Sequence, residues 1–354
     1  MYFANMSMDF FISNLEQLSV HEVGNKNNGG QLYASAESIE VDDESLVALL
    51  QHYFFKPFTN QEFWQFTSSN EDVNLNPIYS FAQQIFNQTS SFHLQSINIA
   101  KHLFECTNHP NIKDGDLYVA YISHVKLGDE MCDAIGIFKS EHKEPFLKAK
   151  RKGKVYDINA DEGINIDKLD KGCIILKLNE EQGYKIAIID KAGRGAEASY
   201  WKDDFLQIKT CADDYNYTRN FLNVAKAYVT QKLNEEFEVT KADQIDLLNK
   251  SVNYFKENER FVAEDFAASV FEDSTVINSF NSFKQTMQTD GDLDMADGFA
   301  INTQAVKKQA RIFKSVLKLD KNFHIYIHGN RNLIERGEDQ NGRKYYKIYY
   351  DNEE

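Results

Sequence analysis

The residues with the clearest potential chemistry are cations that recur at helical spacing near the end of the chain. They are Lys307, Lys308, Arg311, Lys314 and Lys318. In a helix over 303–319, four of them fall four, three and four residues apart and form one stripe beside an apolar stripe. A row of cations suits the phosphate backbone of DNA. It also suits an acidic protein partner, or plain solvent on an ordinary helix face.

A second basic run, K-A-K-R-K-G-K, lies near the middle of the chain. Its cations are Lys148, Lys150, Arg151, Lys152 and Lys154. It belongs to a basic island that begins at Lys139 and includes Lys143. We predict an irregular charged loop over 149–163, in which flexible cations can follow phosphates without reading sequence. The two runs support each other as a DNA surface if they share one face of the molecule.

The last segment is rich in tyrosine, with arginine and lysine nearby: Tyr326, Tyr345, Tyr346, Tyr349, Tyr350 and Arg331. Aromatic rings between cations can stack on single-stranded bases. Tyrosine is also common in ordinary strands, and that interpretation is preferred here.

Evidence for an enzyme is sparse. A metal-dependent nuclease could use Asp133, Glu141 and Lys143, but their spacing fits poorly. The acidic segment at 290–298 lacks the glycine and the closing glutamate of a calcium loop. The four cysteines form no C-x-x-C pair, which indicates reduced thiols in a cytosolic protein. We therefore assign no catalytic residue, no metal and no cofactor, and we favour a binding protein over an enzyme.

The 354 residues carry a net charge of −15, which is unevenly distributed. Residues 1–110 and 201–300 each carry −9, residues 111–200 carry −1, and residues 301–354 carry +4. Because phosphate binding responds to local clusters, an acidic body with basic islands is compatible with DNA binding. The sequence predicts neither a secretory signal nor a membrane span.

Hydrophobic periodicity predicts an α+β fold in two domains, 1–210 and 211–354. In the first domain we expect a hairpin around N-K-N-N-G-G, helices at 45–55, from Pro77 and at 91–106, and two strand pairs. These pairs are 117–125 with 132–140, and 172–178 with 184–190. In the second domain we expect helices over 213–289, the helix at 303–319, and a final hairpin of 323–328 with 344–350.

Several blocks spread along the chain resemble one known family. They include H-E-V-G-N-K at 21–26, S-I-N-I-A-K-H-L-F-E at 96–105, H-P-N-I-K-D-G-D at 109–116 and I-G-I-F-K-S-E at 135–141. In these blocks and their order, the sequence resembles the bacterial 37-kDa nucleoid-associated proteins. The resemblance implies a cytoplasmic protein of the nucleoid that binds DNA without strong sequence preference. It implies no established catalytic residues.

Taken together, residues and resemblance predict a nucleoid-associated protein that holds DNA through backbone phosphates, using the two basic runs. The alternatives are an adaptor that presents the basic helix to an acidic partner, and the metal-dependent nuclease. Expected partners are DNA and other nucleoid proteins, without a membrane. A homodimer would double the cationic surface and so help an acidic protein to hold DNA.

Overall fold

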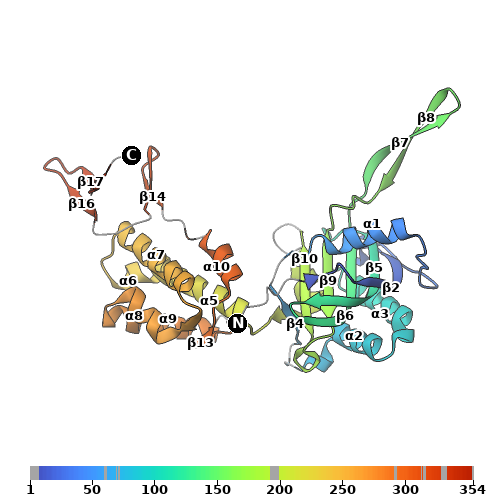
Figure 1. The fold of residues 1–354 in the computed structure, drawn as a ribbon, viewed down its shortest axis with the longest axis horizontal. Coiled ribbons are helices and arrows are strands. Elements are labelled where there is room, and N and C mark those ends of the chain that lie inside the picture. Colours follow the sequence, from blue (N-terminus) through green and yellow to red (C-terminus); the bar gives the residue numbers. More distant parts are fainter. Residues whose placement is uncertain are drawn as a thin grey trace. The chain divides into compact units, whose positions relative to one another are not determined.

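The computed structural model describes residues 8–59, 62–68, 70, 72–191, 199–290, 293–311, 313, 316–327 and 333–352. The chain divides into two compact units, Met1–Cys211 and Ala212–Glu354. Unit 1 combines an antiparallel sheet with helices, and unit 2 is mainly helical with small hairpins (Figure 1). The predicted α+β class is confirmed. No helix among the described residues is long and apolar enough to cross a membrane.

The centre of unit 1 is one antiparallel sheet, in which β1 (Met8–Asp9) pairs with β5 at one end. Across the sheet the order is β11 (Ile208–Thr210), β4 (Trp64–Phe66), β10 (Lys185–Asp190), β9 (Lys171–Leu176), β6 (Glu130–Ser140), β5 (Gly115–Leu127), β2 (Asn14–Val23) and β3 (Leu32–Ala34). The predicted hairpins around N-K-N-N-G-G, between β5 and β6, and between β9 and β10 are confirmed.

Helices cover both faces of this sheet. The helices α2 (Pro77–Asn87) and α3 (Phe92–Glu105) lie on one side, and α1 (Glu44–Phe55) lies on the other (Figure 1). Alternate residues of a strand point to opposite faces. On β6, Ile135 and Ile137 therefore pack in the cluster beneath α2 and α3, while Ala134 and Phe138 pack beneath α1. The central strands are buried on both faces, so polar side chains within them, such as those of Lys139 and Lys171, are buried as well.

The helices of unit 1 begin where the sequence predicts. The Asp43 carboxylate accepts hydrogen bonds from the backbone N–H groups of Ser45 and Leu46, and so caps α1. At α2, Asn76 accepts from the N–H of Tyr79, and Pro77 fills the first turn, where no N–H is needed.

Unit 2 is a helical body with a phenylalanine-rich core. Its helices are α5 (Asp214–Ala227), α6 (Leu233–Glu236), α7 (Lys241–Glu257), α8 (Ala263–Phe271), α9 (Ser274–Asp290) and α10 (Thr303–Ala310). A π-helical stretch, Tyr228–Lys232, joins α5 to α6. The short strands β12 (Arg260–Val262) and β13 (Gly298–Ala300) pair with each other. The Phe221 ring lies 4.1 Å from the Phe261 ring, between centroids, at the middle of the core.

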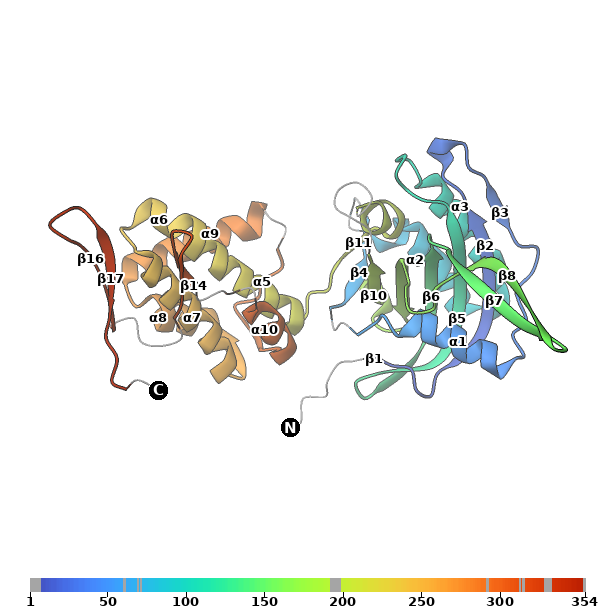
Figure 2. The same cartoon turned by 90° about the horizontal axis from the view of Figure 1, so that it is seen from above.

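The end of unit 2 differs from the prediction. The helix expected over 303–319 ends at Ala310, and β14 (Val316–Leu319) follows as a strand. It pairs with β15 (Phe323–Tyr326), so the predicted pairing of 323–328 with 344–350 is wrong. Instead β16 (Ile334–Glu338) and β17 (Lys344–Ile348) form a separate hairpin, seen in Figure 2.

The apolar residues at helical spacing over 303–319 do not belong to one helix face, because they pack in two different hydrophobic clusters. Phe313 packs with the phenylalanine cluster, whereas Leu317 packs with Ile245, Ile327 and Ile334. No single helix face therefore has to bury both residues.

Candidate nucleic-acid interface

The middle basic run lies on a long β-hairpin over residues 144–163, which we call the arm. Strands β7 (Glu144–Lys152) and β8 (Val155–Gly163) pair without a break, from Glu144 opposite Gly163 to Lys152 opposite Val155. Nine residues in a strand span about 30 Å. The arm projects from the body of unit 1 (Figure 1), and every residue of β7 is exposed. The prediction of an irregular loop over 149–163 is wrong.

The turn at the tip explains why this segment can fold back so tightly. Between the paired residues Lys152 and Val155 the chain has only Gly153 and Lys154. Gly153 has φ +65°, in the left-handed region that glycine enters without steric penalty. The sequence signal is the alternation of apolar and polar residues over 147–150 and 156–161, which the concentration of charge obscures.

One face of the arm is cationic. The register places Lys148, Lys150 and Lys152 on the same face, together with Asp157 and Asp161. The contacts agree: the Lys148 ammonium lies 2.5 Å from Asp161 Oδ2, and the Lys152 ammonium lies 2.7 Å from Asp157 Oδ2. The hydrogen bond from Lys148 lowers the pKa of the Asp161 carboxyl.

Charge increases from the root of the arm to its tip. Residues 148–157 carry five cations and a single carboxylate, whereas the remaining carboxylates lie close to the root. Within the described part of the chain, Lys150 and Lys154 make no ion pair. The existing pairs are solvent-exposed and therefore weak, so a phosphate can replace a carboxylate at little loss.

Three side-chain contacts hold the root of the arm to the body of unit 1. Lys143 Nζ lies 3.0 Å from Asp116 Oδ2, and this contact raises the pKa of Lys143. His142 Nδ1 lies 2.8 Å from Asp170 Oδ1. Lys168 Nζ lies 2.5 Å from Glu144 Oε1. The sequence does not predict these contacts, because the two residues of each pair lie far apart along the chain.

Lys139, the first cation of the basic island, is not on the surface. Its side chain is completely buried, because β6 is covered on both faces. The ammonium donates to the carbonyl oxygen of Lys113 (2.6 Å), to Glu141 Oε1 (2.9 Å) and to the hydroxyl of Tyr200 (3.3 Å). Burial lowers the pKa of Lys139, and Glu141 opposes that shift. Lys139 therefore supports the root of the arm and cannot contact DNA.

A second buried pair lies beside the first. Lys171 Nζ lies 2.7 Å from Asp190 Oδ1, and both side chains are more than nine-tenths buried. The Lys171 ammonium also sits 5.0 Å from the centre of the Tyr200 ring. Buried pairs of this kind fix one arrangement of neighbouring strands, because separating either charge from its partner is costly.

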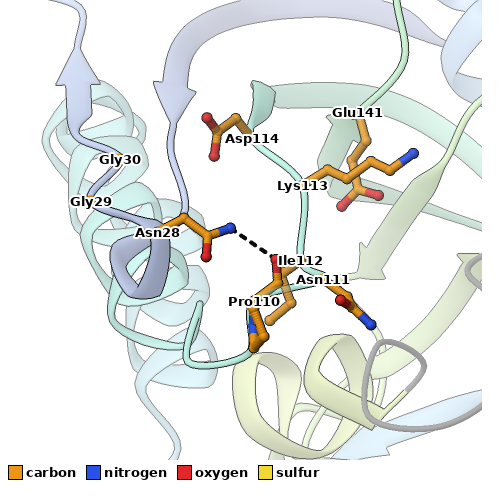
Figure 3. Close-up of a pocket in the computed structure, with 9 residues that line it drawn as sticks. All are labelled: Asn28, Gly29, Gly30, Pro110, Asn111, Ile112, Lys113, Asp114 and Glu141. Carbon is orange, nitrogen blue, oxygen red and sulfur yellow. Dashed lines mark hydrogen bonds between the residues drawn. The ribbon is translucent and has the colours of Figure 1, made fainter.

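An open pocket of about 760 Å³ lies next to this network. Figure 3 shows its lining, with Lys113, Asp114 and Glu141 from one side and the Gly29–Gly30 turn from the other. The amide of Asn28 donates to the carbonyl oxygen of Pro110 (2.8 Å) and closes one wall. Charges of both signs meet here, so the pocket has no selective attraction for phosphate.

The residues of the nuclease alternative do not come together. Asp133 is near the start of β6 and accepts a hydrogen bond from the Tyr121 hydroxyl (2.7 Å). Glu141 and Lys143 follow the other end of that strand, about 26 Å away at 3.3 Å per residue. In the described ranges, no group of three or more His, Cys, Asp or Glu side chains could hold a metal ion. Part of the acidic segment 290–298, Gly291 and Asp292, lies outside the described residues.

The C-terminal cations form a shorter group than predicted. Lys307 and Lys308 occupy the last turn of α10, and Arg311 follows directly; all three are exposed. Lys318 is exposed on β14, so the predicted helical stripe is wrong. Lys314, like Arg331, lies outside the described residues. The opposite face of α10 buries Ala305, Val306 and Gln309.

The tyrosine-rich end also departs from the expected single hairpin. Tyr345 and Tyr346 lie on β17, and Tyr349 and Tyr350 follow it, whereas Tyr326 belongs to the other hairpin. The Lys347 ammonium lies 4.8 Å from the centre of the Tyr349 ring. The predicted aromatic surface is thus divided between two hairpins.

The described geometry defines an α+β protein with clusters of exposed cations on a ribbon arm and at a helix end. The sequence matches the family model described as nucleoid-associated protein YejK over residues 19–353. The chain belongs to this family of nucleoid-associated proteins, and the resemblance noted in the sequence is confirmed. A search of curated proteins finds no match.

Proposed function

We propose that this protein binds DNA without strong sequence preference, through phosphate contacts made by two groups of cations. The first is the arm, with Lys148, Lys150, Arg151, Lys152 and Lys154. The second is the C-terminal group, with Lys307, Lys308, Arg311, Lys314 and Lys318. The observation that carries the proposal is the arm itself, an exposed ribbon with its cations gathered towards the tip.

The arm offers a way for an acidic protein to approach DNA. Its length of about 30 Å is several times the screening length of about 8 Å at physiological salt. Tip cations are therefore screened from the carboxylates of the body. A two-stranded ribbon also has the width that the DNA major groove admits. Contacts from long, flexible lysines go mainly to phosphates, which carry no direct sequence information.

The support for DNA contact is weaker for the C-terminal group than for the arm. Lys307 and Lys308 lie at the negative end of the α10 dipole, where cations stabilise a helix whether or not they bind a ligand. The Lys308 ammonium is also 3.5 Å from the Tyr215 hydroxyl. We therefore expect this group to add affinity to binding that the arm provides.

The test is binding of labelled duplexes of unrelated sequence, measured by fluorescence anisotropy across a salt series. The variant is Lys150→Glu with Lys154→Glu, because these two arm lysines make no ion pair within the described residues. We expect it to weaken binding to all duplexes alike. The matched control, Lys101→Glu with Lys256→Glu, reverses two exposed lysines elsewhere and should bind nearly as the unchanged protein does. Equal loss in both variants would point to net charge alone. No binding of the unchanged protein at about 0.1 M salt would favour the adaptor alternative.

A further inference from the structure

The arm has a second face with a different character. The register places on it the apolar residues Pro145, Leu147, Ala149, Tyr156, Ile158 and Ala160. Arg151 lies on this face near the tip, and Glu162 lies on it at the root. We call this surface the apolar face.

The apolar face is uncovered. Leu147 is 76% exposed, Tyr156 70% and Ile158 65%. No arm residue belongs to any hydrophobic cluster in the described part of the chain. An isolated two-stranded ribbon is only marginally stable in water, and a contiguous exposed apolar strand face is typical of an interaction surface.

We propose that the apolar face joins two copies of this chain, with their arms packed face to face and running in opposite directions. The charge pattern selects this occupant and this direction. Antiparallel packing brings the Arg151 end of each arm over the Glu162 end of the other, so that opposite charges meet twice. Parallel packing would bring Arg151 against Arg151. Phosphates would meet the Glu162 carboxylate on this face, whereas the opposite face supplies three lysines.

The side chains on the apolar face are also complementary in size under a two-fold axis. The two-fold axis passes between the two arms at the level of the Lys148–Asn159 pair and runs parallel to the hydrogen bonds of the ribbon. This axis places β7 of one copy over β7 of the second copy. Leu147 then lies over Ala149, and Ile158 lies over Ala160. Large residues facing small ones allow two layers to interlock at the usual spacing of about 10 Å.

The arrangement closes on itself and stops at two copies. Each apolar face is used once, so the contact is isologous and does not propagate into a fibre. The cationic faces of both arms, with Lys148, Lys150 and Lys152, remain on the outside of the pair. Arg151 then faces Glu162 of the second copy, so the phosphate contacts of a paired arm come from its lysines. The proposal is independent of DNA binding, because the self-association can be measured without any nucleic acid.

The test is the mass of the full-length chain in solution without DNA, by sedimentation equilibrium. We expect twice the chain mass for the unchanged protein and the single-chain mass for Leu147→Glu with Ile158→Glu. Val155→Glu is the matched control, because it places one carboxylate on the cationic face of the same ribbon, and it should remain a pair. Monomeric unchanged protein, or a pair that survives Leu147→Glu with Ile158→Glu, would overturn the proposal.

A charge exchange tests the direction of packing. Arg151→Glu and Glu162→Arg should each weaken the pair, and the two together should restore it, because the opposite charges are then re-formed. Failure of the double variant to recover would contradict antiparallel packing. If Leu147→Glu with Ile158→Glu changes DNA affinity but not mass, the apolar face contacts DNA and the dimer proposal is wrong.

Discussion

The two basic regions of this protein differ in how their cations are supported. On the arm, cations are carried away from the acidic body on a ribbon with no hydrophobic core of its own. At the end of α10, cations lie on the surface of a packed helical unit and stabilise the helix that bears them. We therefore expect the arm cations to serve mainly as DNA contacts, and the cations at the end of α10 to serve partly as structural charges.

Removing the arm should have the largest effect on DNA affinity. Glu144 pairs directly with Gly163, so a short Asn-Gly turn can join them in place of 145–162. We expect affinity for duplex DNA to fall by about 10²- to 10⁴-fold, because up to five phosphate contacts are lost. The melting temperature of unit 1 should hardly change, since the arm is outside its cores. Anisotropy and circular dichroism measure the two effects, and retained affinity would contradict the role of the arm.

A buried lysine of the same basic island should behave differently from the arm lysines. Lys139→Met leaves the Glu141 carboxylate buried without its partner, and we expect a loss of about 3 kcal/mol in the free energy of unfolding. Adding Glu141→Gln should recover much of this loss. Urea denaturation measures it, with Lys143→Met as the exposed comparison, expected to cost under about 1 kcal/mol. An equal loss in the free energy of unfolding at Lys139 and Lys143 would contradict the claim that the buried lysine contributes more to stability than the exposed one.

Acid should lower the free energy of unfolding of unit 1, which carries the arm, without changing the charge of the arm cations. Burial, and the nearby His93, lower the pKa of His21 from 6.5 to about 4. The ring is neutral in the fold, because Nδ1 accepts the backbone N–H of Ser35 while Nε2 bonds Ser96 Oγ.

Between pH 6.5 and 4 the unfolded chain therefore binds more protons than the folded chain. The free energy of unfolding of unit 1 should fall over this window, by roughly 2–3 kcal/mol in total. Urea denaturation at pH 7 and pH 4 measures the change, and His21→Gln should reduce it. An unchanged pH dependence in that variant would exclude His21 as the cause.

The smallest expected effect concerns competition within the arm. Asp161→Asn frees Lys148 from its carboxylate partner, and DNA affinity should rise by a small factor, about two- to fivefold. The control is Asp297→Asn, which removes a carboxylate that pairs with Lys284 in unit 2. A similar gain in both variants would show that total charge, and not the arm, limits binding.

Local signals in the sequence were sufficient for much of the fold. Asp43 and Pro77 marked helix starts because capping depends only on nearby backbone groups. The burial of Lys139 could not be foreseen, because it depends on β6 lying in the middle of a sheet covered on both sides. The sequence predicts a loop in place of the arm, although alternation is present at 156–161, because so high a density of charge is typical of irregular chain.

The C-terminal helix was extended too far for a different reason. Phe313 and Leu317 fit helical spacing, but they belong to separate cores, and spacing alone cannot reveal that. The arm cations are exposed, but they lie on a hairpin and not on the predicted loop, and their contact with DNA stays a prediction.

The most direct test compares the two regions with equal charge removed. Lys150, Lys152 and Lys154 are changed to Gln in one variant, and Lys307, Lys308 and Arg311 in the other. The slope of log affinity against log salt is then measured for each. We expect the arm variant to lose up to about 2.7 units of slope, at 0.9 per phosphate contact, and the C-terminal variant to lose less. An unchanged slope in the arm variant, with the loss confined to the C-terminal variant, would contradict the claim that the arm is the main DNA contact.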